Sequence, residues 1–303
     1  MNTVQTLSMY TKPTVDVSMV VANFNNGRYL DEFFRSILCS TALPREIIFV
    51  DDGSTDDSLV IARRAAEDVK CMKIIALPKN VGFANALNAG IASSVASYIM
   101  RMDPDDILLP TRIERQYDYI TRHELDVVGG NALIFHSSTG ASIGSTNFPS
   151  DHSDIEKTII KGENGVLHAT VMGRAAFFKS EPYIQENVPA EDYDIFARFL
   201  TRGARFGNFT EPLIRYRIHD TSASARLRYS TILRTYQLRD SIFGGHTPRW
   251  KVRTYYWFIK CYRNYLDSRS TVSKYVWAGL SSVCYPQKLA RKIARRVAYR
   301  PGR

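Results

Sequence analysis

The chain has 303 residues, of which 45% are hydrophobic and 23% charged, a composition typical of a folded globular protein with a substantial core. Its net charge of +10 is unevenly placed: residues 224–303 carry 18 Lys or Arg and two Asp or Glu, a net +16, whereas residues 1–223 carry a net −6. The acidic balance of the longer part argues against a nucleic-acid surface there, so we expect no nucleic-acid partner.

The cysteines and the N-terminal residues indicate a compartment. The four cysteines have spacings that fit no zinc or redox motif, which predicts free thiols in a reducing cytosol. The first 13 residues lack the pattern of a signal peptide, and the longest uncharged stretch of the basic tail, 275–287, is too short and polar to span a bilayer. We therefore expect a cytoplasmic protein, with peripheral attachment to the inner face of the membrane as an open alternative.

Short apolar runs alternate with amphipathic patterns along the first half of the chain. The predicted strands are 17–21, 47–52, 73–77, 98–103 and 126–135, and the predicted helices are 29–38, 54–69, 82–94 and 110–123. Continuously apolar strands are typical of a parallel sheet that is buried on both faces. The order predicts an α/β fold with a Rossmann-like, mostly parallel open sheet and helices on both faces.

The second half is less regular. Residues 136–165 are polar and predict a long connection, 166–173 predicts a strand, 190–203 a helix, and 208–220 a strand followed by a loop. The predicted α/β domain therefore covers residues 15–223. The basic, aromatic-rich tail, 224–303, has few strand signals and is predicted to be a helical extension.

Two acidic segments follow predicted strands. In an open α/β sheet, ligands bind at the carboxyl ends of strands, where "IMRMDPDD" (99–106) and "VDDGSTDDS" (50–58) fall. Asp103 and Asp105 are two residues apart, so in an extended turn both can share a Mg²⁺ or Mn²⁺ ion. The alternative is a turn whose acids cap a helix.

The DDGS segment allows the same two interpretations. Asp51 and Asp52 can accept hydrogen bonds from a nucleobase or ribose. Alternatively, Gly53 permits a tight turn and Ser54 or Thr55 caps the following helix.

A third acidic segment, "AEDYD" (190–194), opens a predicted helix. A carboxylate near the positive end of the helix dipole would stay ionised, as a general base must, but a simple capping role fits as well. Further on, His219 follows Arg215 and Arg217 and is either structural, a metal ligand or, with Arg217, part of a diphosphate site. His168 is predicted to be packed, and Arg101 and Arg198 to pair with nearby acids.

The order of these segments is more specific than any one of them. The series runs "VSMVVANFNNGRYLDEFFRSIL", "EIIFVDDGSTDDS", "NVGFANALNAGI", "YIMRMDPDDILLPTRIERQ", "LHATVMGRAAF", "EDYDIFARFLTRG" and "EPLIRYRIHDTSAS". Together they resemble the family-2 glycosyltransferases with the GT-A fold, of the type that builds bacterial cell-surface polysaccharides. The resemblance covers residues 17–224, about two thirds of the chain.

The resemblance implies where a nucleotide binds. It places Ala22, Phe24 and Asn25 near the base, and Asp51 and Asp52 against the nucleobase and ribose. Ala22 stands where the family usually has Pro or Thr, and Phe24 where it usually has Tyr, so ring stacking is kept and a hydroxyl is lost. The family often has Arg-Asn where Leu87 and Asn88 stand, so any donor contact from that arginine is absent.

It also implies a reaction. The family's D-x-D motif matches Asp103 and Asp105, with Asp105 as the direct ligand of Mg²⁺ or Mn²⁺ and Asp103 nearer the ribose and diphosphate. Glu191 and Asp192 match its Glu-Asp pair, with Asp192 as catalytic base. The implied activity is an inverting, metal-dependent transfer from a nucleoside-diphosphate sugar, expected to be UDP-linked, to a glycan or a polyprenyl-diphosphate-linked acceptor.

The basic tail has two interpretations, and two functions other than glycosyl transfer are alternatives for the chain. Cations and aromatics alternate in 249–266, and 287–300 forms a basic amphipathic pattern, so the tail either contacts an anionic membrane surface or has a solvated basic face. A sugar-nucleotide pyrophosphorylase would need a Gly-rich basic loop after the first strand, which "ANFNNGRYL" lacks. A non-catalytic membrane- or nucleic-acid-binding protein would leave the ordered acids without a role.

Overall fold

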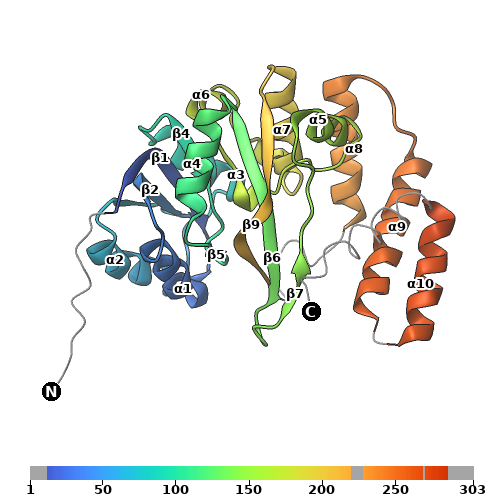
Figure 1. Ribbon diagram of the computed structural model, residues 1–303, viewed down its shortest axis with the longest axis horizontal. Helices are drawn as coiled ribbons and strands as arrows, with labels where there is room; N and C mark the ends of the chain where they lie inside the picture. The colour runs from blue at the N-terminus through green and yellow to red at the C-terminus, as the bar shows by residue number, and fades with distance from the viewer. Residues whose placement is uncertain (1–11, 220–227, 269, 286–303) are drawn as a thin grey trace.

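A nine-stranded sheet runs through the computed structural model, which describes residues 12–219, 228–268 and 270–285 (Figure 1). Eight strands lie in the order β3, β2, β1, β4, β8, β6, β9, β5, and β7 pairs with β6 beside this row. Their bounds are β1 Thr14–Asn23, β2 Leu43–Asp51, β3 Met72–Ala76, β4 Tyr98–Arg101, β5 Ile107–Leu108, β6 Val127–His136, β7 Ser142–Ser145, β8 Met172–Arg174 and β9 Phe206–Ile218. The long pairings are parallel, which confirms the predicted fold class.

The first four strands of the row are parallel. β1 pairs with β2 and β4, and β2 pairs with β3. The helices that connect them are α1 Gly27–Leu38, α2 Ser58–Asp68 and α3 Phe83–Ala92. These elements confirm the predictions over this part of the chain, with small shifts at their ends, and they bring the carboxyl ends of β1, β2 and β4 to one edge.

Alternating strand residues face two hydrophobic layers. In β1, Met19 and Val21 join the layer under α1, α2 and α4 (Arg112–Arg122). Val20 joins the opposite layer, under α3, α5 (His152–Ile160), α6 (Ala175–Ser180) and α7 (Glu191–Thr201). A Cβ atom at Gly90 of α3 would lie 2.6 Å from Val20 Cγ1, so this glycine lets the helix approach the sheet closely.

The strand predicted over 166–173 is wrong for most of its length. His168–Thr170 form a 3₁₀ turn, and only Met172–Arg174 form a strand, β8, which runs antiparallel between β4 and β6. The Thr170 hydroxyl bonds locally to the carbonyl of Leu167, at 2.7 Å, and such bonds favour a turn over an extended strand.

The connection predicted over 136–165 is also more structured than expected. It contains β7 and α5, whose N-cap Asp151 accepts a hydrogen bond from Asp154 N at 3.0 Å. Only Ile155 and Ile159 of α5 are buried, which leaves too few apolar residues to produce a clear helical period.

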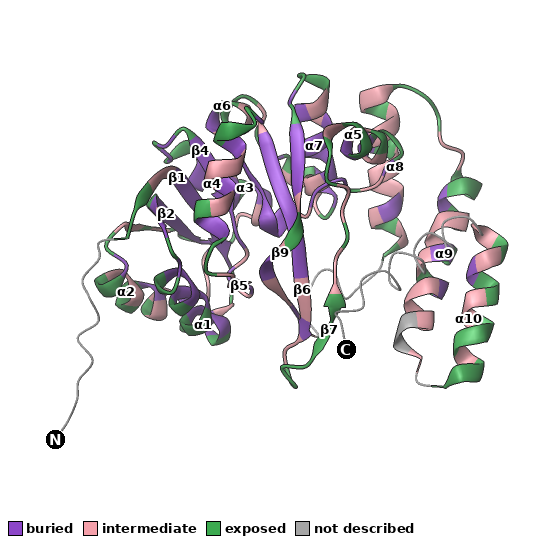
Figure 2. Cartoon of the chain, viewed as in Figure 1, coloured by how far each residue is buried: buried purple, intermediate pink, exposed green. Residues whose placement is uncertain are grey.

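Three helices follow the sheet: α8 Tyr229–Phe243, α9 Arg249–Asp267 and α10 Thr271–Cys284. They confirm the helical tail as far as the structure describes it, while the amphipathic pattern at 287–300 lies outside the described residues. α8 packs against α7 and α9, and α10 lies alongside α9 at the far side of the molecule from α2 (Figures 1 and 2). Across the described ranges, no helix combines the length and the apolar character needed to cross a membrane.

Candidate active site

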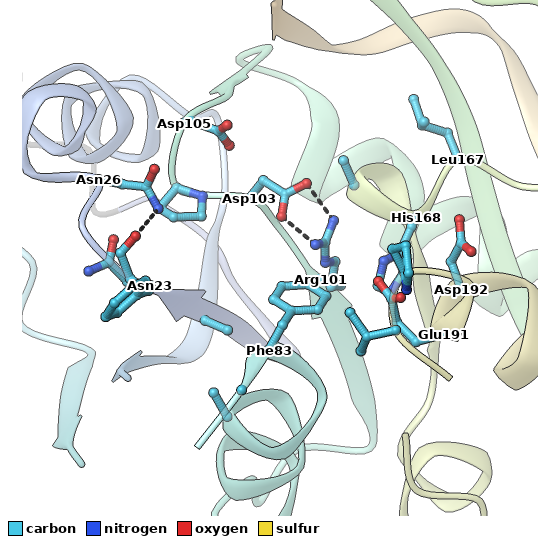
Figure 3. A pocket seen from close by; sticks show the side chains of 18 of the residues that line it. Asn23, Asn26, Phe83, Arg101, Asp103, Asp105, Leu167, His168, Glu191 and Asp192 are labelled. Carbon is cyan, nitrogen blue, oxygen red and sulfur yellow. Dashed lines mark hydrogen bonds and ion pairs between the residues drawn. The ribbon is translucent and has the colours of Figure 1, made fainter. Parts of the chain in front are cut away.

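A cavity of about 850 Å³ opens at the carboxyl ends of β1 and β4 and extends to the start of α7 (Figure 3). Five carboxylates that the sequence analysis singled out line it: Asp52, Asp103, Asp105, Glu191 and Asp192. Ala22 and Phe24 line it as well. Segments more than a hundred residues apart in the sequence therefore contribute acids to one cavity.

The DDGS turn is held by its own hydrogen bonds. Asp52 accepts hydrogen bonds from Val81 N at 2.7 Å and Gly82 N at 3.0 Å, and so ties the turn to the start of α3. Asp51 is buried and accepts a hydrogen bond from the Ser54 hydroxyl at 2.6 Å. Gly53 has φ +68°, which confirms the predicted tight turn. Of the two acids, only Asp52 faces the cavity.

The segment after β1 presents one ring to the cavity. Phe24 is 45% exposed and lines the cavity, so its ring is accessible from the cavity. Asn25 does not line the cavity: its carboxamide oxygen accepts a hydrogen bond from Thr55 N at 2.8 Å, beyond the DDGS turn. The structure therefore brings Ala22 and Phe24 to the cavity and leaves Asn25 as a brace beside it.

Asp103 is paired with a buried arginine. Arg101, only 4% exposed, donates two hydrogen bonds to the Asp103 carboxylate and lies over the Phe83 ring at 5.2 Å (Figure 3). The expected pairing of Arg101 with a nearby acid is confirmed. This bidentate pair fixes the direction of the Asp103 carboxylate and offsets its charge.

Asp105 and Asp106 have different surroundings. Asp105 Oδ2 lies 3.0 Å from His219 Nε2, and Asp106 Oδ1 accepts a hydrogen bond from Arg217 N at 2.8 Å. Arg217 Nε also donates to the carbonyl of Asp105 at 2.6 Å, so Arg217 and His219 support the acidic turn from behind and do not line the cavity. Burial, together with the charges of Asp105 and Asp103, raises the pKa of Asp106 well above its usual range.

This turn fits a hard divalent cation. Asp103, Asp105 and Asp106 each offer a carboxylate oxygen, and these oxygens lie within 4.8 Å of one another. Asp106 Oδ2 is buried and has no hydrogen-bond partner among the described residues. Carboxylate oxygens are the ligands that Mg²⁺ and Mn²⁺ prefer, and a cation would relieve the repulsion among them.

Glu191 and Asp192 form the other acidic end of the cavity. Asp192 accepts hydrogen bonds from Asn164 Nδ2 at 2.5 Å and from Tyr193 N at 2.6 Å. Burial raises the pKa of Asp192, and burial together with the Asp192 charge raises the pKa of Glu191 to about 7. Glu191 Oε2 is buried without a hydrogen-bond partner within the described ranges.

The sequence analysis missed several residues that line the cavity. Asn164 and the tail residues Arg228 and Arg263 belong to it and lie in no quoted motif, and Phe83 belongs to it from within the segment NVGFANALNAGI. Arg101 did leave a signal, because a charged residue interrupts an otherwise apolar strand.

The prediction that His168 is packed is confirmed. His168 is buried, with its Nε2 2.7 Å from the Tyr183 hydroxyl, although one edge of it reaches the cavity. Burial, with Arg101 nearby, lowers the pKa of His168 well below its usual value, so this side chain is neutral.

Comparison with known proteins identifies the family. A sequence model described as glycosyl transferase family 2 matches residues 18–183, and the chain belongs to that family. The chain is 30% identical over 253 residues to the O-antigen biosynthesis glycosyltransferase WbnJ of Escherichia coli, an alignment that covers 81% of this chain and 93% of WbnJ. It is 27% identical to the amylovoran biosynthesis glycosyltransferase AmsE of Erwinia amylovora, over 73% of this chain and 83% of that protein.

Solved structures share the fold. Residues 1–349 of TarS from S. aureus superpose with a TM-score of 0.60 at 16% identity, over 91% of this chain and 82% of that one. The mannosyltransferase PcManGT from Pyrobaculum calidifontis, solved with GDP-Man and Mn²⁺, superposes with a TM-score of 0.57 at 14% identity, over 93% of this chain and 79% of that one. The GT-A fold that the resemblance implied is confirmed.

Proposed function

We propose that this protein is an inverting, metal-dependent glycosyltransferase that moves a sugar from a UDP-sugar to a hydroxyl group of an acceptor during surface polysaccharide synthesis. One observation carries the proposal: the Asp103–Asp105 turn and the Glu191–Asp192 pair line the same cavity. The first provides ligands for a cation that binds a diphosphate, and the second provides a base. In a metal-dependent, inverting transfer, the cation assists the departure of the diphosphate and the base takes the proton of the acceptor hydroxyl.

Asp192 is the proposed catalytic base. Two hydrogen bonds, from Asn164 and from the Tyr193 amide, hold its carboxylate and stabilise the ionised form. Asp192 takes the proton of the acceptor hydroxyl, and the oxygen attacks the anomeric carbon from the face opposite the nucleotide. The bond from that carbon to the diphosphate oxygen breaks as the new bond forms, so the configuration inverts. Glu191, beside it, exchanges a proton near neutral pH because its pKa is raised to about 7.

Asp103 and Asp105 would hold the divalent cation, Mg²⁺ or Mn²⁺. When bound, the cation offsets negative charge on the departing nucleoside diphosphate. In this proposal His219 orients the Asp105 carboxylate or joins it as a ligand, and Arg217 fixes the backbone of the turn. Mn²⁺ accompanies GDP-Man in the PcManGT structure, which supports a metal at the equivalent turn.

The nucleotide is proposed to bind along the ends of β1 and β2. Ala22 and Phe24 would lie near the base and Asp52 near the base or ribose, since these three line the cavity. Asn25 and Asp51 would act through the turns that they brace. TarS structures are described with UDP and with UDP-GlcNAc, and this supports UDP as the nucleotide.

The acceptor is proposed to be a growing glycan or a polyprenyl-diphosphate-linked sugar at the inner face of the cytoplasmic membrane. WbnJ and AmsE are named for O-antigen and amylovoran synthesis, which supports a surface polysaccharide as the product. The catalytic part would be residues 15–223, while Arg228 and Arg263 of the tail complete the cavity wall. The match to the glycosyl transferase family 2 model supports neither the pyrophosphorylase nor the non-catalytic alternative.

Calorimetry tests the nucleotide site. UDP, GDP and dTDP are titrated with and without Mn²⁺ into the wild type, Asp105→Ala and the control Asp154→Ala, which changes an exposed acid that does not line the cavity. We expect metal-dependent binding of UDP that is lost in Asp105→Ala alone. Failure of the wild type to bind any nucleotide would contradict the proposed activity. Binding of GDP or dTDP in place of UDP would change the donor and leave the reaction class intact.

A further inference from the structure

The outer face of α10 is apolar. Val272, Tyr275, Val276, Leu280 and Val283 are all exposed, and Val283 is 84% exposed. Their spacing of three or four residues places them on one stripe of the helix, together with Gly279, and no charged residue interrupts the stripe. Soluble proteins rarely leave so continuous an apolar stripe exposed to water, so we infer that another molecule or surface covers this face.

α10 turns its valines away from the protein, while Trp277, Ala278 and Cys284 on its inner side are half-buried. The side that is turned toward the protein carries Ser281, which is fully buried, whereas the valines point outward. Figure 2 shows α10 at the edge of the molecule, alongside α9, with exposed residues along its outer side. The apolar stripe therefore does not serve the protein's own core.

The neighbouring helix α9 adds aromatic and basic side chains. Trp250 is 63% exposed and lies seven residues before the exposed Trp257, with Arg253 between them on the same stripe. Lys251 Nζ lies 5.7 Å from the Trp250 ring and Lys260 Nζ lies 5.0 Å from the Trp257 ring. Exposed tryptophans beside cations are typical of a protein surface that meets the headgroup region of a bilayer.

We propose that these two stripes form a docking face for an anionic phospholipid bilayer, with α10 lying in the plane of the interface. α10 has 14 residues, so it is about 21 Å long and suits a position along the surface. The segment Arg249–Cys284 carries seven Lys or Arg and one Asp. This charge attracts anionic lipid and repels a second copy of the same face, which makes the bilayer the favoured occupant.

The docking face also lies close to the proposed chemistry. Arg263 belongs to α9, the helix that carries the two exposed tryptophans, and it lines the cavity. A bilayer bound at α9 and α10 would bring a lipid-linked acceptor toward the cavity, because α9 contributes both to the docking face and to the cavity wall. The binding face itself does not depend on the proposed reaction, and the two can be tested separately.

Vesicle flotation of the full chain tests the face. The probes are vesicles of phosphatidylcholine alone and vesicles enriched in phosphatidylglycerol. We expect the wild type to float only with the anionic vesicles. A variant with Val272→Ser, Val276→Ser and Val283→Ser should bind on the order of tenfold more weakly, because the stripe loses its apolar surface. A variant with Lys251→Gln, Arg253→Gln and Lys260→Gln should lose about fivefold per cation and most of its salt dependence.

The control carries Val60→Ser and Val95→Ser, which change two exposed valines outside the tail, and it should float like the wild type. UDP titration and circular dichroism of each variant check the site and the fold independently of lipid. The proposal is overturned if the wild type stays free of anionic vesicles at low salt, or if the three-valine variant binds them as well as the wild type. It is also overturned if the wild type self-associates through these valines and ignores vesicles, since a second copy would then be the occupant.

Discussion

The two ends of the cavity hold their carboxylates in different ways. At the end formed by β1 and β4, the acids that line the cavity have specific partners: Asp103 has Arg101 (Figure 3), Asp105 has His219, and Asp52 has two backbone amides. At the end formed by α7, Glu191 keeps one buried oxygen without a hydrogen bond within the described residues, and its pKa is raised to about 7.

This difference suits the two groups of carboxylates to two roles, ligand binding and proton transfer. A carboxylate that is fixed and electrically balanced is suited to hold a ligand, because its charge and direction do not change during turnover. A carboxylate with a raised pKa exchanges a proton near neutral pH, as acid–base chemistry requires. Asp106 also has a raised pKa, but it does not line the cavity. We therefore expect binding at the β1 and β4 end and proton transfer at the α7 end, and each prediction below changes one of the two.

The largest effect is expected from Asp192→Asn. A carboxamide cannot take the acceptor proton, so kcat should fall about 10²- to 10⁴-fold, while UDP affinity stays unchanged because the other end of the cavity is intact. Transfer assays and calorimetry on the same preparation measure both quantities. An Asp192→Asn enzyme that retains substantial transfer would remove Asp192 from the base assignment.

The next largest effect is expected on stability, from Arg101→Gln. This change leaves the half-buried Asp103 carboxylate without its buried cationic partner, which should lower the free energy of unfolding by about 3 kcal/mol, the lower end of the range for a buried pair, and abolish metal-dependent UDP binding. Arg198→Gln is the matched control, because Arg198 pairs with Glu181 and Asp194 away from the cavity. Urea unfolding should show both variants weakened, and only Arg101→Gln should lose UDP. Equal UDP affinity in the two variants would contradict a role of Arg101 in the site.

Glu191→Gln should change how stability depends on pH. The folded state raises the pKa of Glu191 from its usual 4.5 to about 7, so the folded protein binds this proton more tightly than the unfolded chain. This group therefore favours folding most below pH 4.5, and its contribution is lost as the pH rises toward 7. Glu191→Gln removes that loss, and its stability relative to the wild type should increase by roughly 1–3 kcal/mol across the interval.

Urea midpoints measured at several pH values for the wild type, Glu191→Gln and Glu67→Gln check this. Glu67 is exposed on α2, and its substitution should leave the pH profile parallel to that of the wild type. A Glu191→Gln profile that also runs parallel to the wild type would mean that Glu191 titrates normally in the folded protein.

Much of the fold was predictable because the first half of the chain follows strong local rules. Runs such as 17–21 and 47–52 are long and apolar, and they alternate with helices that have a clear apolar stripe. The errors fall where long-range contacts decide the structure. The hydrogen bonds of the Thr170 hydroxyl favour a turn in its segment. In α5 only two isoleucines are buried, and they become buried only when the complete core forms around them.

The site was predictable to the extent that its residues lie in spaced motifs. Asp103 and Asp105 could be found because closely spaced acids at the carboxyl end of an apolar strand indicate a ligand site. Asn164 could not be found, because a single asparagine in a polar loop carries no pattern, and its contact with Asp192 spans 28 residues. The tail arginines were missed for the same reason, since only the packing of α8 and α9 brings them to the cavity.

The smallest effect is expected from Asn164→Ala. Its side chain donates a 2.5 Å hydrogen bond to Asp192 Oδ2 and so lowers the pKa of that carboxyl, against the burial that raises it. Without this bond the pKa of Asp192 rises further, so the acid limb of the kcat profile should move to higher pH, while kcat at high pH stays close to that of the wild type. A uniform loss of kcat at every pH would instead show that Asn164 positions the acceptor or the base. An unchanged profile would show that the Tyr193 amide alone suffices to keep Asp192 ionised, and the α7 end would then rely on backbone contacts as the Asp52 turn does.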